Sequence, residues 1–196
     1  GGWYFEYRND WYPDVDDTAV AGVALLRTGL ADSDPKVKLA IDRAMEWVIG
    51  MQSKNGGWGA FDADNTHYYL NHIPFADHGA LLDPPTVDVT ARCLSFLAQA
   101  GLPRDHQAIQ RGLSYLQREQ EDDGSWYGRW GTNYIYGTWS TLCAVNACGE
   151  DHASPYIRKA VEWLKKRQRA DGGWGEGGET YWKERRDHTL ASTPSQ

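Results

Sequence analysis

Two kinds of apolar pattern alternate along the chain. In 43–58, 111–126 and 159–174 an opening segment places apolar residues every three or four positions among charged ones, which is typical of an amphipathic helix. Between these lie "DVDDTAVAGVALLRTGL", "VDVTARCLSFLAQAGL" and "YGTWSTLCAVNACG", each with a Thr near its start and then apolar on nearly all sides. Helices that are apolar all round are buried, whereas amphipathic helices suit an outer layer. The pattern predicts inner and outer helices in alternation.

The amphipathic segments are copies of one repeat that align without gaps. Each copy ends its helical part with a Gln, passes through a Gly-containing turn and reaches a Trp six residues after the Gln: Gln52 and Trp58, Gln120 and Trp126, Gln168 and Trp174. We expect the Gly to end the helix with a positive φ, and the Trp to fold back onto the Gln amide. By themselves these units are scaffold.

Two concentric helical layers describe an all-α fold, the α/α barrel, and three helix pairs fill half to two-thirds of such a toroid. Residues 1–196 are therefore expected to be part of a single α/α-barrel catalytic domain that is truncated at both ends and does not close alone. The first repeat spacing is 68 residues (43 to 111) and the second 48 (111 to 159), so 59–85 is interpreted as a loop insertion of the functional kind.

Composition excludes several partners. The net charge of −7 argues against nucleic acid. Cys93, Cys143 and Cys148 have no metal or disulfide spacing and indicate a reducing compartment, with the last two expected in helix cores. The Asp62–Asn65 stretch lacks the Gly and Glu of a calcium loop, and the His spacing does not suit a helical metal site. We expect neither metal nor cofactor.

The candidate chemistry lies in "WYPDVDDTAV", where Asp14, Asp16 and Asp17 fall within four residues. The plain interpretation is a helix start, with an Asp cap and acids in the first turn. However, the helix that follows is of the buried type, and its surroundings are aromatic. Carboxylates in a dry site can share protons and leave one protonated near neutral pH. Helix geometry sends Asp14 and Asp17 to one side and leaves Asp16 free to offer its proton to a guest.

Together, the Gln–Trp repeats, the D-V-D-D-T-A stretch and "YGRWGTNYIYGT" resemble the squalene-hopene cyclase family of triterpene cyclases, from end to end of the chain. The resemblance implies acid-initiated cyclisation of squalene to hopene or hopanol, with Asp16 as proton donor and with Asp14 and Asp17 tuning it. Water and anionic bases would quench a carbocation, so such a pocket must be dry and lined by aromatic faces.

By the family pattern, Phe5 and Trp130 stabilise cationic intermediates, and Phe61 also faces the substrate. Tyr136 matches a tyrosine that serves the water chain returning protons to the acid, and Phe75 falls at the substrate entrance. For each of these, ordinary aromatic packing is the alternative. The resemblance further implies an isomerase that binds squalene and needs no cofactor. The full-length protein is expected on the cytoplasmic face of the bacterial membrane as a monotopic protein, with a homodimer left open.

One position departs from the pattern. Where some relatives have a His beside the catalytic Asp, this chain has Arg92. Arg92 either pairs with Asp88 four residues earlier on the same helix, or meets Asp16, where its permanent charge would tune the acid and Asp88 would help to offset it.

Other functions share parts of this pattern. A glycoside-active enzyme on an α/α toroid would need two carboxyl groups facing each other across a bond, which one helix turn supplies poorly. A protein prenyltransferase β-subunit would need zinc ligands. A non-catalytic helical repeat module would not need an acid cluster at a buried helix start.

Overall fold

The computed structural model describes residues 1–6, 9–73, 81–182 and 184. Its α-helices are α1 (Val15–Arg27), α2 (Pro35–Gly50), α3 (Val87–Gln99), α4 (Gln107–Arg118), α5 (Asn133–Ala147) and α6 (Pro155–Arg167). Short 3-10 helices are η1 (Leu30–Asp32), η2 (Tyr68–His72) and η4 (Gly178–Tyr181). Two strands, β1 (Trp3–Tyr4) and β2 (Pro13–Asp14), pair antiparallel with Trp3 opposite Asp14. The prediction of an all-α chain is confirmed.

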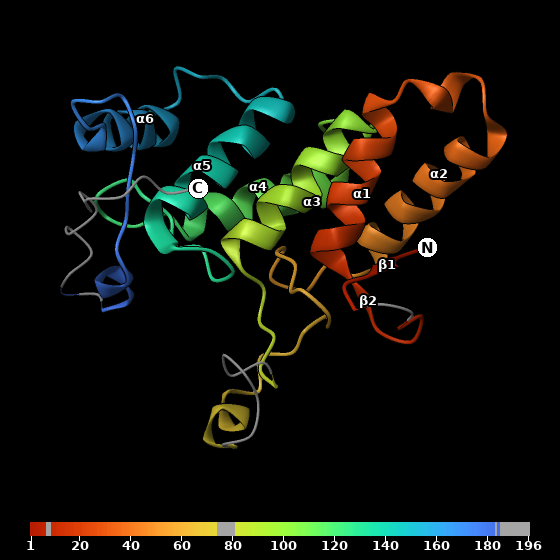
Figure 1. Ribbon diagram of the computed structural model, residues 1–196, viewed down its shortest axis with the longest axis horizontal. Coiled ribbons are helices and arrows are strands. Elements are labelled where there is room, and N and C mark those ends of the chain that lie inside the picture. Colours follow the sequence, from red (N-terminus) through yellow and green to blue (C-terminus); the bar gives the residue numbers. More distant parts are fainter. Residues whose placement is uncertain (7–8, 74–80, 183, 185–196) are drawn as a thin grey trace.

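The helices form two layers. Helix α3 packs between α1 and α5, and these three make the inner layer (Figure 1). Helices α2, α4 and α6 each pack against the inner helix that precedes them in the chain. The three inner helices all begin on the lower side of the helical layers as seen in Figure 1. This is the predicted alternation, and the result is an incomplete α/α barrel.

The core lies between the layers and is centred on α3. Nine of the 13 residues of α3 are buried, among them Phe96, Leu94 and Leu97, which have no exposed surface. Trp58 and Trp126, the repeat tryptophans of the first two units, are also completely buried. The amphipathic pattern in the sequence is explained because α4 and its counterparts offer only one face to this core.

Hydrogen bonds close each repeat unit. The indole Nε1–H of Trp58 donates to the Val48 carbonyl at 2.6 Å, and that of Trp126 donates to Leu116 at the same distance. The Gln120 amide donates to the Gly124 carbonyl at 2.9 Å and also reaches the Tyr156 carbonyl on α6 at 2.9 Å. The first two units are therefore tied both to their own helices and to the next outer helix.

The expected glycine cap is displaced. Gly56, Gly124 and Gly172 do have positive φ angles of 97°, 101° and 85°. However, α2 ends at Gly50, and its cap Met51 has φ −84°. The left-handed glycines lie instead in the turn that follows, four residues beyond each Gln, where their carbonyls accept the Gln amide. The prediction of a glycine C-cap was wrong in position, because the Gln side chain closes a separate turn.

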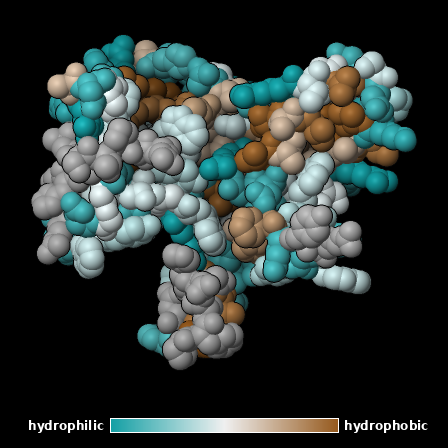
Figure 2. Space-filling model, viewed as in Figure 1, coloured by the Kyte–Doolittle hydropathy of each residue, from teal (hydrophilic) through white to brown (hydrophobic). Residues whose placement is uncertain are grey.

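The inner layer has one face that no described helix covers. A cavity of about 610 Å³ runs along α1, α3 and α5 there, and Val20 and Trp139 are exposed on its walls. Cys148 is buried as predicted, but Cys143 is exposed on this face, so the expectation that it lies in a helix core was wrong. Figure 2 shows apolar side chains gathered over α1 and α2 on one side and over α5 and α6 on the other.

The long insertion projects from the layers. Its described parts, 59–73 and 81–85, leave the lower edge in Figure 1 and carry η2 at the far end. Tyr68 and Tyr69 on η2 are exposed. Among the described residues, no helix has both the length and the apolar character needed to cross a membrane.

The close packing of α1 on α3 gives a test of the fold. A Cβ at Gly22 of α1 would overlap the ring of Phe96, whereas a Cβ at Gly50 of α2 would meet nothing within 4 Å. We expect Gly22→Ala to lower the stability of the full-length protein by about 1–3 kcal/mol through overpacking. Gly50→Ala is the matched control and should raise stability by up to about 1 kcal/mol. Thermal unfolding measures both; equal effects would contradict the observed α1–α3 contact.

Candidate active site

The acid cluster sits where β2 runs into α1. Asp14 is the N-cap of α1, and its Oδ1 accepts the amide hydrogen of Asp17 at 2.9 Å. Thr18, one turn into the helix, donates to the Asp14 carbonyl at 2.6 Å and accepts the Trp3 amide at 2.8 Å. The helix-start interpretation therefore holds for Asp14. The side chains of Asp16 and Asp17 do not cap the helix.

Arg92 meets Asp16. Its Nε lies 3.3 Å from Asp16 Oδ1, across the contact between α3 and α1. Asp88, the other candidate partner, instead accepts the backbone amide of Trp130 through Oδ2 at 2.7 Å. Asp88 is completely buried, and its Oδ1 has no hydrogen-bond partner among the described residues. The two alternatives left open by the sequence are thereby decided in favour of the Arg92–Asp16 ion pair.

Tyr136 completes this polar group from α5. The Nη2 of Arg92 donates to the Tyr136 hydroxyl at 3.1 Å, and the guanidinium carbon lies 5.8 Å from the centroid of the Tyr136 ring. Burial, followed by the nearby charge of Asp88, raises the pKa of Tyr136 to about 12, so its hydroxyl keeps its proton at neutral pH. One inner helix thus contributes the acid, the second the guanidinium and the third the hydroxyl.

A cavity of about 330 Å³ opens beside the acids. The residues that line it are Phe5, Asp14, Asp16, Asp17, Ala60, Phe61 and Trp130. The structure therefore brings the three predicted acids together with three of the predicted aromatic residues. Phe61 is further held by Tyr12, whose ring stacks on it with centroids 4.8 Å apart. Phe5 is 75% exposed and Trp130 39%. Phe75, expected at the entrance, lies outside the described residues.

Burial decides the charge state of Asp16. A helix N-terminus and the guanidinium of Arg92 both favour the ionised carboxylate. Against them stand the loss of hydration and the charges of Asp14, Asp88 and Asp17. Desolvation is the largest of these effects, and it raises the pKa of Asp16 from 3.8 to about 7. Burial also raises the pKa of Asp14, although the amide of Asp17 opposes the shift. An acid that is half protonated near pH 7 is suited to donate a proton.

One buried carboxylate beside the cavity was not predicted. Asp83, at the end of the long insertion, is only 3% exposed and accepts the backbone amides of Phe61 and of its two neighbours. The available signal was an acid placed between an apolar pair and two prolines in "LLDPP". Among the described residues, no group of three or more His, Cys, Asp or Glu side chains is arranged to hold a metal ion.

The family model for the squalene-hopene cyclase C-terminal domain matches residues 1–196. Squalene-hopene cyclase of Zymomonas mobilis is 60% identical over 182 residues, which is 92% of this chain and 28% of that protein. Squalene-hopene cyclase of Schizosaccharomyces japonicus is 60% identical over 196 residues, the whole of this chain and 29% of that protein. The chain thus spans less than a third of the length of these relatives.

The fold has relatives among solved structures. The type II terpene cyclase MstE from Scytonema, in complex with geranylgeranyl dihydroxybenzoate, superposes with a TM-score of 0.62 at 21% identity. The likeness covers 92% of this chain and 45% of that chain. At this identity the comparison shows the fold alone.

The raised pKa of Asp16 predicts a pH-dependent gain in stability for Asp16→Asn. An unfolded Asp ionises near pH 4, whereas the folded one keeps its proton up to about pH 7, so the folded state is progressively disfavoured between these values. Replacing the acid removes this cost. Relative to wild type, the variant of the full-length protein should gain stability as the pH rises from 4 to 7 and then level off, by a free energy on the order of 4 kcal/mol, seen as a higher melting temperature.

Asp64→Asn is the control with the opposite sign. The backbone amide of Lys54 and the Lys54 charge lower the pKa of Asp64, so its ionised form is favoured on folding. Its contribution is present above the ordinary Asp pKa and is lost as the pH falls. Asp64→Asn should therefore lower the melting temperature at neutral pH. A lower melting temperature for Asp16→Asn at pH 8 would contradict the assignment of a raised pKa.

Proposed function

The chain belongs to the squalene-hopene cyclase C-terminal domain family, and from this premise we propose that the protein it forms part of cyclises squalene. Asp16 donates its proton to a terminal double bond. The π electrons of that bond form the new C–H bond and leave a tertiary carbocation. Successive double bonds then attack it and close rings, until loss of a proton gives hopene or capture of water gives hopanol. Asp16 finally regains a proton.

The observation that carries this proposal is the protonated carboxyl at an aromatic cavity. An acid with an ordinary pKa would be ionised at neutral pH and could donate nothing, whereas Asp16 has a pKa of about 7. It lines the same cavity as Phe5, Phe61 and Trp130. At about 330 Å³ the cavity is at the small end of ligand sites, which suits the reacting end of a long hydrocarbon.

The aromatic side chains at the cavity can stabilise a carbocation without reacting with it. A carbocation beside a carboxylate or water would be quenched, but the face of an aromatic ring attracts it without a bond, by about 1–2 kcal/mol when water is excluded. Phe61 and Trp130 occupy the cavity wall from two different loops. The glycoside-active alternative is not favoured, because the relatives with high identity carry the name squalene-hopene cyclase.

Arg92 sets the strength of the acid. Its charge stabilises the conjugate base of Asp16, which makes proton transfer easier, while burial keeps enough of the acid protonated at rest.

We further propose that the full-length protein associates with the cytoplasmic face of the membrane as a monotopic protein, since squalene dissolves in lipid; a homodimer is compatible with this arrangement.

Replacing the proton donor should stop turnover. In the full-length protein, Asp16→Asn keeps the size of the side chain but removes the acid, so squalene turnover should fall about 10²–10⁴-fold or more. Asp17→Asn is the control on the same helix turn and should cost less, since Asp17 acts by its charge. Product is measured by gas chromatography with matched folded protein. Near-normal turnover in Asp16→Asn with loss in Asp14→Asn would show that the donor is misassigned.

The pH dependence should follow Asp16. Turnover should fall as the pH rises through about 7, because the donor loses its proton. Arg92 lowers this pKa, so Arg92→Gln should move the falling limb to higher pH and also reduce the plateau, since the acid is weaker. Arg92→Lys retains the charge and should keep the limb near its original position. A limb that does not move in Arg92→Gln would contradict the role given to the ion pair.

A further inference from the structure

Residues 60–62, here called the strap, form one wall of the acid cavity. The strap lies against the start of α1, where the Val15 amide donates to the Ala60 carbonyl at 2.7 Å. Ala60 and Phe61 both line the cavity together with Asp16. The position of the strap therefore sets where the Phe61 ring stands relative to the acid.

Asp83 binds every backbone amide of the strap. Its Oδ1 accepts the Ala60 amide at 3.0 Å, and its Oδ2 accepts the amides of Phe61 at 2.6 Å and Asp62 at 2.8 Å. The side chain is buried. Three backbone donors, one of them buried and two partly buried, converge on one buried carboxylate and form a clamp, because these amides would lose their hydrogen-bond partner without it.

The clamp is fitted closely and anchored on both sides. At Gly59, a Cβ would lie 2.8 Å from both Asp83 Oδ2 and the Asp83 carbonyl oxygen, so only glycine lets the two segments approach this far. The Asn65 amide donates to the Leu81 carbonyl and to Asp62 Oδ2, both at 3.0 Å, which joins the outgoing and returning arms of the insertion.

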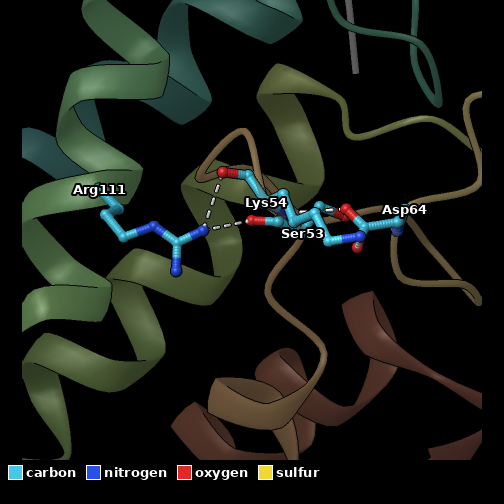
Figure 3. A network of polar contacts seen from close by, with 4 residues as sticks. All are labelled: Ser53, Lys54, Asp64 and Arg111. Carbon is cyan, nitrogen blue, oxygen red and sulfur yellow. Dashed lines mark hydrogen bonds and ion pairs between the residues drawn. The ribbon is translucent and has the colours of Figure 1, made fainter.

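A second set of contacts ties the insertion to the outer layer. Arg111 on α4 donates to the carbonyls of Ser53 and Lys54, at 2.7 and 3.0 Å, while Asp64 accepts the Lys54 amide from the other side (Figure 3). The Asp64 amide in turn donates to Ser53 Oγ at 2.9 Å. The base of the insertion is thus fixed independently of Asp83. The Asp83 side chain therefore holds the strap and not the base of the insertion.

We propose that Asp83 is a positioning residue for the cyclisation: by binding the strap amides it fixes Phe61 at the cavity wall, and so determines how far ring closure proceeds after proton donation by Asp16. This inference rests on the proposed function. A ring displaced from the path of the cation no longer stabilises it at the right stage, and the cation is then lost early as partly cyclised product.

Glu176 provides a matched control within the chain. It is also a buried carboxylate, and it accepts two backbone amides, those of Tyr134 at 3.0 Å and Ile135 at 2.8 Å. These amides start α5 rather than the strap, and Glu176 does not line the acid cavity. Loss of this carboxylate should therefore cost stability without changing the course of the reaction.

The experiment compares Asp83→Asn, Glu176→Gln and Phe61→Leu in the full-length protein. In Asp83→Asn the new amide group faces backbone donors, so hydrogen exchange should accelerate at residues 60–62; in Glu176→Gln it should accelerate at 134–135 and stay unchanged at the strap. With squalene, Asp83→Asn should lower kcat up to about 10²-fold with little change in KM. It should also release partly cyclised products, as we expect of Phe61→Leu, whereas Glu176→Gln should keep the wild-type products.

A double variant separates positioning from general damage. If Asp83 acts through Phe61, Asp83→Asn combined with Phe61→Leu should be no worse than the more severe single change. Effects that multiply, strap exchange that stays slow in Asp83→Asn, or wild-type products despite a loosened strap would each overturn the proposal. Should Asp83→Asn fail to fold, Asp83→Glu keeps the carboxylate but shifts it by one methylene group, and must show the same change of products.

The two proposals fail in different ways. Wild-type protein that cyclises no squalene would overturn the proposed function. The exchange contrast between Asp83→Asn and Glu176→Gln would still decide whether Asp83 holds the strap.

Discussion

One threonine of each inner helix accepts the backbone amide hydrogen of a tryptophan: Trp3 near the start of the chain, and the buried repeat tryptophans Trp58 and Trp126. The pairs are Trp3 with Thr18 at 2.8 Å, Trp58 with Thr90 at 2.9 Å and Trp126 with Thr138 at 3.0 Å. All three threonines are completely buried, so an unpaired amide there would find no water. Because each threonine lies in the first two turns of its helix, the bond fixes where the inner helix begins. The starts of α1, α3 and α5 are thereby held at one edge of the layer.

This shared edge explains how the site is assembled. Asp16, Arg92 and Tyr136 all lie in the first two turns of the three inner helices, and they meet because these helices begin at the same edge. Helix N-termini favour negative charge, so an exposed acid at this edge would be ionised. Burial removes much of the hydration of Asp16, and this desolvation, together with the charges of Asp14, Asp88 and Asp17, raises its pKa despite the guanidinium of Arg92. The scaffold thus places the acid, and burial raises its pKa.

The sequence predicted what is local or periodic. Helix periodicity and the Gln–Trp repeat predicted both layers, whereas Phe5, Phe61 and Trp130 were expected at the site from the family resemblance. The sequence could not decide between Asp88 and Asp16 as the partner of Arg92, because Asp88 and Arg92 are four residues apart and could form a salt bridge along the helix. The choice depends on a tertiary contact: the Trp130 amide occupies the Asp88 carboxylate. Asp83 was missed for a similar reason, since it binds amides 21 to 23 residues away, across an insertion without periodicity.

The arginine at position 92 also divides the work of the site. A guanidinium does not give up its proton in proteins, so Arg92 can stabilise the conjugate base of Asp16 but cannot return a proton to it. The same Arg92 donates to the oxygen of Tyr136, which leaves the hydroxyl hydrogen of Tyr136 available to another acceptor. With its pKa raised to about 12 by burial and by the charge of Asp88, that hydroxyl stays protonated. Under the proposed function, acid strength and proton supply therefore belong to different groups: Arg92 tunes the acid, and water together with a hydroxyl of the kind expected at Tyr136 returns the proton.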